Sequence, residues 1–303
     1  MSLAARPADA AQAARRAEAL GARLPPLLVA AERVASTVAQ GVHGRRRVGQ
    51  GDSFWQFRRF LPGDAVNRID WRQSARSDNA FVRETEWEAA QTVCVWRDGG
   101  RSMHWRSRGQ SVDKVERAEL LVLALAALLL RGGERVSLIG SGRRAVSGRA
   151  GLERLAEQLS ELGEGDDGLP QDSVLPRHGR VVLVSDFLAP LPRIQALVGR
   201  MASVPVTGHL VQVLDPAEAL LPYEGRVRFA WHGDARGGGL ETLIPRVEGV
   251  REAYAERLAM QQDGLAAICS AAHWGFSVHR TDHSPEAALL ALYTALSPEP
   301  GHR

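Results

Sequence analysis

The chain has 303 residues, enough for one large domain or for a domain with a smaller module. Hydrophobic residues make up 45% of it and charged residues 24%, which is ordinary for a soluble globular protein. The net charge of +3 is small for this length, so composition by itself does not argue for a nucleic-acid-binding protein.

Cysteine usage and the longest apolar run indicate a compartment. Cys94 and Cys269 each lie inside an apolar run and are interpreted as reduced core residues. The longest apolar run, residues 120–130, is too short to span a bilayer, and Glu119 and Arg131 flank it closely. We therefore expect a buried helix, no membrane span and a cytoplasmic protein.

The N-terminal part is expected to be helical. Residues 1–40 are rich in Ala and Arg, and Pro25 and Pro26 break them before a second helix at about 27–38. Residues 41–51, GVHGRRRVGQG, form a basic, glycine-rich loop. Its three consecutive arginines suit a solvated loop better than a nucleic-acid patch, which is usually longer.

The next segment is dense in aromatic residues. Strand pieces are predicted near 53–60 and 79–96, and a short helical turn at about 65–74 joins them. The triplets PGD and SDN mark turns between these pieces.

From residue 91 onward, strands and helices alternate. The pattern predicts strands at 91–97, 134–140, 143–147, 181–186, 206–214 and 275–279, and helices at 112–131, 151–163, 191–202, 247–272 and 285–296. This alternation favours an α/β fold with a doubly wound, mostly parallel sheet and right-handed crossovers.

One segment interrupts the alternation. Residues 216–246 contain two alternating runs around a glycine-rich turn, which indicates a β-hairpin. We therefore divide the chain into an N-terminal helical segment, 1–40, a β-rich subdomain formed by 41–90 together with 216–246, and an α/β domain, 91–300. Pairing the two β segments in one subdomain would bury apolar strand faces and shield strand edges.

Two apolar strands end in an aspartate, Asp98 and Asp186. Ligands of parallel sheets bind beyond the carboxyl ends of strands, at the switch point in strand order. With Ser102 and Ser185 nearby in sequence, these carboxylates suit a hard divalent cation such as Mg²⁺. The alternative is that the aspartates only cap the helices that follow.

These residues carry a resemblance: the segment 91–296 resembles a von Willebrand factor A-type domain. Such domains have a metal-ion-dependent adhesion site, written Asp-x-Ser-x-Ser after the first strand and completed by a later aspartate. The resemblance implies a metal site at Asp98, Ser102 and Asp186.

The sequence departs from that pattern at several positions. Gly100 replaces the first serine, Ser147 is a weak counterpart of the family threonine, and Phe187 follows the second aspartate where glycine is usual. Arg97 and Arg101 flank Asp98 and raise the local positive potential. We therefore expect a degenerate site with weak or lost Mg²⁺ binding and no other cofactor.

An arginine at such an edge can also bind a partner's carboxylate directly, without a metal. The residues expected to bind a partner are Asp98, Arg101, Ser102 and Asp186.

The upstream segment carries a second, more specific resemblance. Its landmarks are Phe57, Arg59, Pro62-Gly63-Asp64, Arg68, Ile69-Asp70-Trp71, Ser74-Ala75-Arg76 and Arg83-Glu84. They are similar to the hallmark of a bacterial family called domain of unknown function 58. Its members are often encoded beside MoxR-type AAA+ ATPases and are thought to act with them, which implies such an ATPase and an unknown client protein as partners.

Charged and aromatic residues alternate in this segment. The charged ones, expected to form a salt-bridge network or else a docking face, are Arg59, Asp64, Arg68, Asp70, Arg76, Arg83 and Glu84. The aromatic ones, expected in the core, are Phe54, Trp55, Phe57, Phe60 and Trp71.

Three functions remain open on the sequence. The first is a non-enzymatic interaction or adaptor protein that works with a MoxR-type ATPase. The second is a metal-dependent phosphoester hydrolase that uses Asp98 and Asp186, although no general base or activated nucleophile lies near either in sequence. The third is an arginine-rich nucleic-acid binder, which composition does not favour.

Overall fold

The structure is a computed structural model that describes residues 28–39, 54–60, 69–76, 79–85, 91–162, 168–171, 173–231 and 240–296. The chain divides into two compact units. Residues 41–90 form the smaller one, and residues 1–40 together with 91–303 form the larger one.

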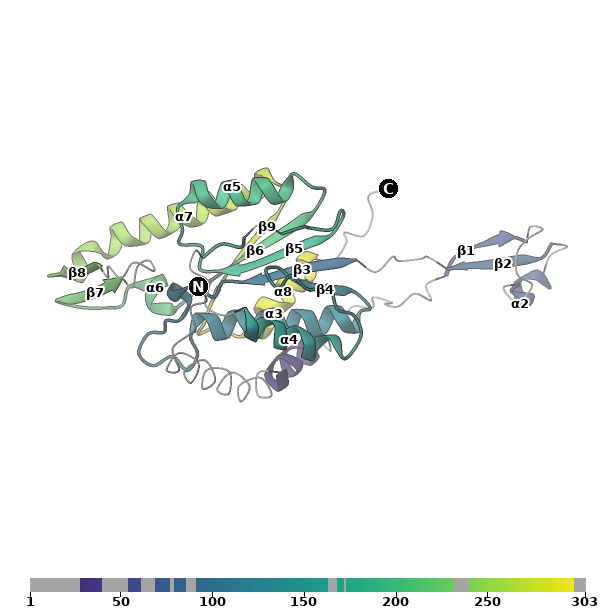
Figure 1. Cartoon of the computed structure of the whole chain (residues 1–303), viewed down its shortest axis with the longest axis horizontal. Helices are drawn as coiled ribbons and strands as arrows, with labels where there is room; N and C mark the ends of the chain where they lie inside the picture. Colours follow the sequence, from purple (N-terminus) through teal and green to yellow (C-terminus); the bar gives the residue numbers. More distant parts are fainter. Residues whose placement is uncertain are drawn as a thin grey trace, which may run out of the picture. The chain divides into compact units, whose positions relative to one another are not determined.

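The larger unit is built on a five-stranded parallel sheet with the order β4-β3-β5-β6-β9 (Figure 1). Its strands are β3 (Thr92–Arg97), β4 (Arg135–Leu138), β5 (Arg180–Ser185), β6 (Thr207–Leu214) and β9 (Gly275–Arg280). Every pair of neighbours in this sheet is parallel. The predicted α/β class is confirmed, and the continuous apolar run of β5 is buried as a central parallel strand should be.

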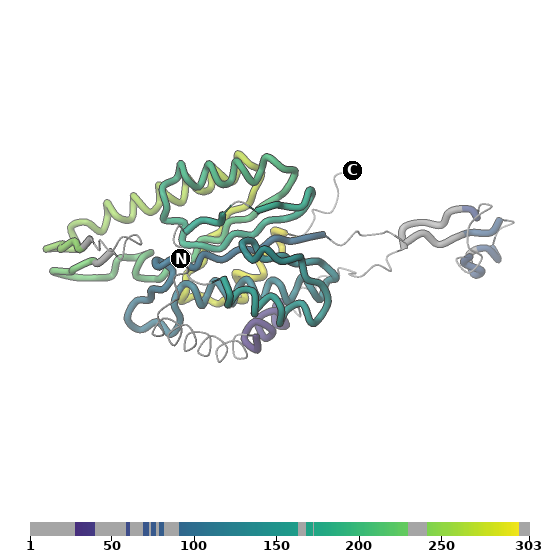
Figure 2. The backbone as a smooth tube through the Cα atoms, viewed as in Figure 1, coloured from purple at the N-terminus to yellow at the C-terminus, as the bar shows by residue number. Residues whose placement is uncertain are grey.

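Helices cover both faces of the sheet. They are α3 (Lys114–Arg131), α4 (Gly151–Glu161), α5 (Leu191–Ala202), α6 (Pro216–Leu220), α7 (Arg251–Ala271) and α8 (Pro285–Leu296), with short 3-10 turns η2 (Arg101–Met103) and η3 (Val247–Val250). On one face α3 packs with α4 and α8, and on the other face α5 packs with α7 (Figure 2). The core therefore lies in two layers, one on each side of the sheet.

The apolar run of the sequence forms the centre of α3. Asp113 and Glu116 make a capping box that starts this helix, and every side chain from Leu121 to Leu130 is buried. At its end Arg131 forms an ion pair with Glu32 of the helical segment 28–39, which packs in the same unit. No helix among the described residues is both long enough and apolar enough to cross a membrane.

Strand order fixes a switch point. Across the sheet, the second strand of the chain (β4) comes first, next to the first (β3), and the third, fourth and fifth (β5, β6 and β9) follow on the other side of β3. The direction in which strands are added therefore reverses between β3 and β5. Crossovers leave these two neighbours toward opposite sides, which opens a crevice at their carboxyl ends. Asp98 and Asp186 directly follow these two strands.

The two predicted hairpins form separate sheets. β1 (Phe54–Arg59) pairs with β2 (Phe81–Thr85), and β7 (Val227–Trp231) pairs with β8 (Leu240–Ile244), both antiparallel. The first hairpin belongs to the smaller unit and the second to the larger one. The β-rich subdomain expected from 41–90 together with 216–246 stays a prediction.

Two expectations are corrected. The strand predicted at 143–147 is reduced to a single antiparallel bridge between Val146 and Val136. Trp71, expected in the core, is 67% exposed at the start of the one-turn helix α2 (Trp71–Ser74).

The charged network of the smaller unit is described only in part. Arg59 and Arg76 are exposed and Asp70 is half-buried, and both Arg59 and Asp70 interact with other groups. Asp64, Arg68 and the side chains of Arg83 and Glu84 lie outside the described residues, as do the side chains of Phe54, Trp55 and Phe57. The expected network therefore stays a prediction.

Candidate functional site at the switch point

The structure brings Asp98 and Asp186 to the same edge of the sheet. β3 and β5 are paired in register up to Arg97 and Val184, and the backbone N–H of Asp98 continues the ladder by donating to the Val184 carbonyl at 2.8 Å. The two aspartates therefore follow neighbouring strands at one level. Their side chains are only 1% and 4% exposed.

Asp98 is held by protein hydrogen-bond donors on both of its oxygens. The hydroxyl of Ser185 donates to Oδ2 at 2.7 Å, and the backbone N–H of Gly100 donates to Oδ1 at 2.7 Å. Gly168 lies against the same carboxylate, since a Cβ there would lie 3.5 Å from Oδ2. Burial raises the pKa of Asp98 above its ordinary value, although the two hydrogen bonds act against this shift.

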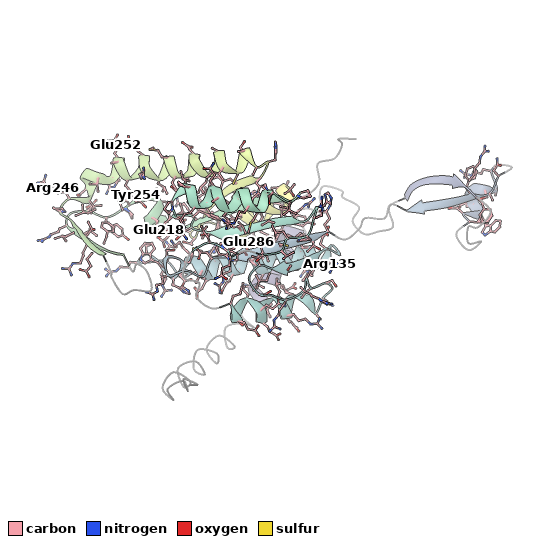
Figure 3. The ribbon with its side chains drawn as sticks, turned by 45° about the horizontal axis from the view of Figure 1, so that its top comes forward. Arg135, Glu218, Arg246, Glu252, Tyr254 and Glu286 are labelled. Carbon is pink, nitrogen blue, oxygen red and sulfur yellow. The ribbon has the colours of Figure 1, made fainter. Side chains whose placement is uncertain are left out.

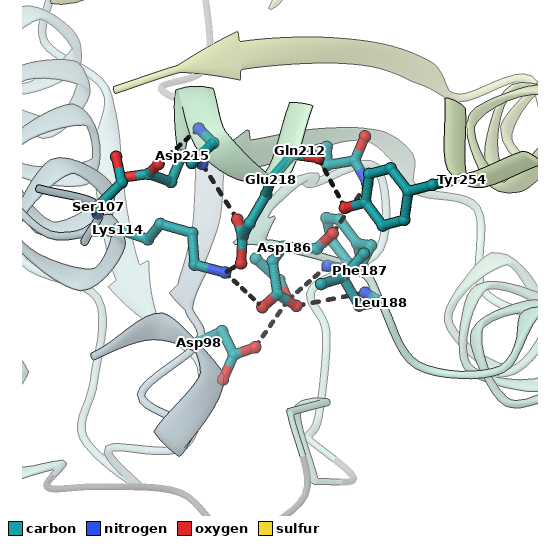
Figure 4. Close-up of polar contacts among 12 residues, drawn as sticks. Asp98, Ser107, Lys114, Asp186, Phe187, Leu188, Gln212, Asp215, Glu218 and Tyr254 are labelled. Atoms are coloured by element: carbon teal, nitrogen blue, oxygen red, sulfur yellow. Dashed lines mark hydrogen bonds and ion pairs between the residues drawn. The ribbon is translucent and has the colours of Figure 1, made fainter. Parts of the chain in front are cut away.

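The side chain of Lys114 points into the site from the first turn of α3 (Figure 4). Its Nζ lies 3.0 Å from Oδ2 of Asp186 and 2.6 Å from Oε1 of Glu218, and the lysine is fully buried. Burial alone would lower the pKa of Lys114, but the charges of Asp186 and Glu218 and their hydrogen bonds outweigh it and raise this pKa. Lys114 is thus an ammonium shared by two carboxylates.

Helix α6 delivers Glu218 to this position. The sequence Asp215-Pro216-Ala217-Glu218 forms a capping box, in which Asp215 accepts from the Ala217 N–H at 2.7 Å and Oε2 of Glu218 accepts from the Asp215 N–H at 3.1 Å. The hydroxyl of Tyr254 on α7 donates to the Glu218 carbonyl at 2.6 Å. Figure 3 places Glu218 and Tyr254 near each other, away from Arg135 at the amino end of β4.

The loop after β5 is held in an unusual conformation. Phe187 has a φ of 46° although it is not glycine, and its side chain is 1% exposed. Its N–H donates to Ser185 Oγ at 3.1 Å, the Leu188 N–H donates to Oδ1 of Asp186 at 3.2 Å, and Gln212 donates to the Asp186 carbonyl at 2.8 Å. Phe187 therefore occupies the left-handed conformation for which glycine is the usual residue.

Not all predicted site residues join this cluster. Ser102 is half-buried and Arg101 is exposed in the turn η2, directly after Asp98. Ser147 directly follows Val146, which is bridged to Val136 near the amino end of β4. The site lies at the carboxyl ends of the strands, so Ser147 does not belong to it.

The side chain of Arg97 does not act on Asp98 in the way expected from the sequence. It lies with α3 and α4, where Nε is 3.3 Å from Oε1 of Glu119 and a guanidinium nitrogen donates to the Leu159 carbonyl. Successive side chains of a strand point to opposite faces, and Arg97 lies on the face that α3 and α4 cover.

Sequence reasoning missed Lys114 and Glu218, which complete the cluster. Two signals could have found them. Lys114 is the only lysine among the 38 lysine and arginine residues of the chain. A lysine at this one position, where every other such residue is arginine, indicates a special environment. The Asp-Pro-Ala-Glu stretch at 215–218 predicts a capped helix directly after an apolar strand, at the same edge as Asp98.

The site has a simple chemical description. Both oxygens of Asp98, of Asp186 and of Glu218 accept a hydrogen bond from the protein. Among the described residues, no three His, Cys, Asp or Glu side chains are arranged to hold a metal ion. The arrangement positions charge at the switch point and leaves no carboxylate oxygen of the three without a donor.

Comparisons with known proteins identify relatives. The family described as Protein of unknown function DUF58 matches residues 56–264. Uncharacterized protein Rv1480 of Mycobacterium tuberculosis (strain ATCC 25618 / H37Rv) is 26% identical over 226 residues, 69% of this chain and 69% of that protein. The resemblance found in the sequence to the family, and its bacterial character, are confirmed.

Solved structures show weaker similarity. An aerotolerance-related membrane protein from Bacteroides fragilis NCTC 9343 has 15% identity and a TM-score of 0.37, covering 68% of this chain and 98% of that chain. An Uncharacterized Membrane Spanning Protein from Vibrio fischeri has 16% identity and a TM-score of 0.18, covering 69% and 99%. Both of these proteins are named as membrane proteins, whereas the sequence predicted a cytoplasmic protein, and that prediction is not retained.

Proposed function

The chain belongs to the family described as Protein of unknown function DUF58, and we propose that it is a non-enzymatic adaptor. In this proposal it binds a MoxR-type AAA+ ATPase and a client protein. The binding edge is the switch point, as a degenerate metal-ion-dependent adhesion site of a von Willebrand factor A-like domain.

One observation carries the proposal against an enzyme: the three carboxylates of the switch point are largely buried, and each of their oxygens accepts a hydrogen bond from the protein. A general base or a nucleophile must be accessible to the substrate. Asp98, Asp186 and Glu218 instead accept from protein donors, and their side chains are largely buried. Such an arrangement supports a rigid binding edge rather than a hydrolytic centre.

Arg101 supports direct binding of a partner at that edge. It is exposed in η2, three residues after Asp98. A guanidinium presents a planar fork that binds a carboxylate through two hydrogen bonds, so an acidic side chain of the partner would suit it. The ATPase as a partner is implied by the family resemblance. The exposed arginine would bind it through an acidic side chain on the ATPase surface.

The test uses a purified MoxR-type ATPase encoded in the same genome and surface plasmon resonance with immobilised protein. We expect saturable binding in EDTA as well as in Mg²⁺, about tenfold weaker in Arg101→Ala because one charged contact in an interface is worth a kcal/mol or more. Arg135→Ala is the matched control, since this exposed arginine lies at the amino end of β4. Its affinity should equal that of the wild type.

Two results would contradict the proposal. One is the absence of binding to the ATPase in any nucleotide state. The other is Mg²⁺- or Mn²⁺-dependent hydrolysis of a phosphodiester that is lost in Asp98→Ala, which would establish the hydrolase instead.

A further inference from the structure

A von Willebrand factor A-like edge implies a divalent cation, but the residues present at this one do not fit such an ion. Mg²⁺ demands near-octahedral oxygen ligands at about 2.1 Å. Gly100 supplies no side-chain oxygen, and each oxygen of Asp98 already accepts one hydrogen bond, from Ser185 or from Gly100. A metal ion at Asp98 would have to share these oxygens with the two donors, and it would lack the hydroxyl ligand that position 100 does not supply.

The position between the other two carboxylates already holds a positive charge. Lys114 Nζ lies 3.0 Å from Asp186 and 2.6 Å from Glu218. It therefore bridges the carboxylate that follows β5 and the carboxylate in the first turn of α6. Its charge also acts on Asp98, where it favours the ionised form. A dication bound to Asp186 would lie close to this ammonium and would be repelled by it.

The place of Lys114 in its helix shows that the carboxylates hold it there. Lys114 is in the first turn of α3, where the helix dipole disfavours a positive charge. It is also 0% exposed, and a buried charge needs a partner. A compact ammonium on a flexible stem fits between two carboxylates, whereas a guanidinium would bring five donors that all require acceptors.

We propose that the ammonium of Lys114 is the resident cation of this site and takes the place of a divalent metal ion. The carboxyl edge then keeps one arrangement whether or not divalent ions are present. This inference stands on the site alone and does not require the ATPase partner.

The first test is on the wild-type protein. Isothermal titration calorimetry with MgCl₂, MnCl₂ and CaCl₂ at constant ionic strength should show no saturable binding at micromolar concentrations. The melting temperature should be equal in Mg²⁺ and in EDTA. Micromolar Mg²⁺ affinity that is abolished by Asp98→Ala would overturn the proposal outright.

The second test opens the site. Lys114→Ala removes the ammonium and leaves space, so the variant should melt at a lower temperature. It should also bind Mg²⁺ or Mn²⁺ at least about tenfold more tightly than the wild type. These ions, and not NaCl at equal ionic strength, should raise its melting temperature. A folded Lys114→Ala protein with the wild-type melting temperature and no response to divalent ions would refute the resident cation.

Two variants serve as controls. Gly100→Ser restores a hydroxyl but retains the lysine, so it should not raise Mg²⁺ affinity. Arg143→Met breaks an exposed ion pair with Glu161, whose atoms lie 2.7 Å apart, and should produce no response to divalent ions.

A third comparison keeps the proposal testable if Lys114→Ala does not fold. The triple variant Lys114→Met, Asp186→Asn, Glu218→Gln removes the ammonium together with both contacting carboxylates. It should melt at a higher temperature than Lys114→Met alone, which leaves two buried carboxylates uncompensated. If the triple variant is no more stable than Lys114→Met, the lysine does not balance these carboxylates and the proposal is wrong.

Discussion

Ser185 Oγ lies 2.7 Å from Oδ2 of Asp98, and this hydrogen bond joins the carboxyl ends of the neighbouring strands β5 and β3. The same hydroxyl oxygen accepts from the N–H of Phe187. One buried hydroxyl therefore serves a carboxylate of the switch point and the strained loop after β5.

Ser185→Ala should destabilise the protein by about 1–3 kcal/mol, because it leaves the buried Asp98 oxygen and the Phe187 N–H without this partner. Urea unfolding of both proteins measures the change. Ser160→Ala is the control, since its hydroxyl bonds the Glu157 carbonyl on an exposed part of α4. It should shift stability by no more than about 0.5 kcal/mol.

Phe187→Gly tests two opposed effects at one residue. Glycine relieves the φ of 46°, which is worth about 1 kcal/mol, but removal of a buried ring costs about 3–5 kcal/mol. We therefore expect a net loss of about 2–4 kcal/mol in chemical denaturation. His178 also has a left-handed backbone, with a φ of 61°, but is exposed. His178→Gly should be neutral or slightly stabilising, and a loss as large as that of Phe187→Gly would show that burial is not the cause.

Gly208→Ala tests how closely β6 packs. A Cβ at this residue would lie 2.2 Å from the ring of Trp274, which is itself buried. The substitution should cost about 1–3 kcal/mol through overpacking. Gly199 in α5 is the matched control, because a Cβ there meets nothing within 4 Å. Gly199→Ala should stabilise by about 0.5–1 kcal/mol, since alanine favours the helix.

A buried histidine should make stability depend on pH. Burial lowers the pKa of His209 to about 4, against 6.5 in an exposed histidine. Above pH 6.5 the residue is neutral in both states, and its contribution is fully present. As the pH falls from 6.5 toward 4, only the unfolded chain binds the proton, so stability decreases by up to about 1.4 kcal/mol per pH unit.

His209→Gln should remove this part of the pH dependence. The comparison between variant and wild type isolates it from Asp98, whose raised pKa acts in the opposite direction. Urea unfolding at about pH 4.5 and about pH 6.5 is the measurement. The exposed His104 gives a control substitution, His104→Gln, which should leave the slope unchanged. Equal slopes for wild type and His209→Gln would contradict the assignment.

Local patterns were sufficient for most of the elements and for one part of the site. Apolar alternation and glycine or proline turns depend on neighbouring residues, so the strands ending at Asp98 and Asp186 and the helices between them were predicted close to their observed bounds. The rule that parallel strands expose their carboxyl ends together placed both aspartates at one edge. The family resemblance was also visible in the residues of the upstream segment.

The tertiary structure alone decided what those aspartates contact. Lys114 meets Asp186 across 72 residues of sequence and Glu218 across 104 residues, and no local pattern encodes such distances. Crossover direction and strand register bring the start of α3 beside the start of α6, and burial then requires the ammonium and the carboxylates to pair. Arg97 likewise lies on the face that α3 covers, next to Glu119. Side chains alternate along a strand, and only the packing of the helices determines which face offers a partner.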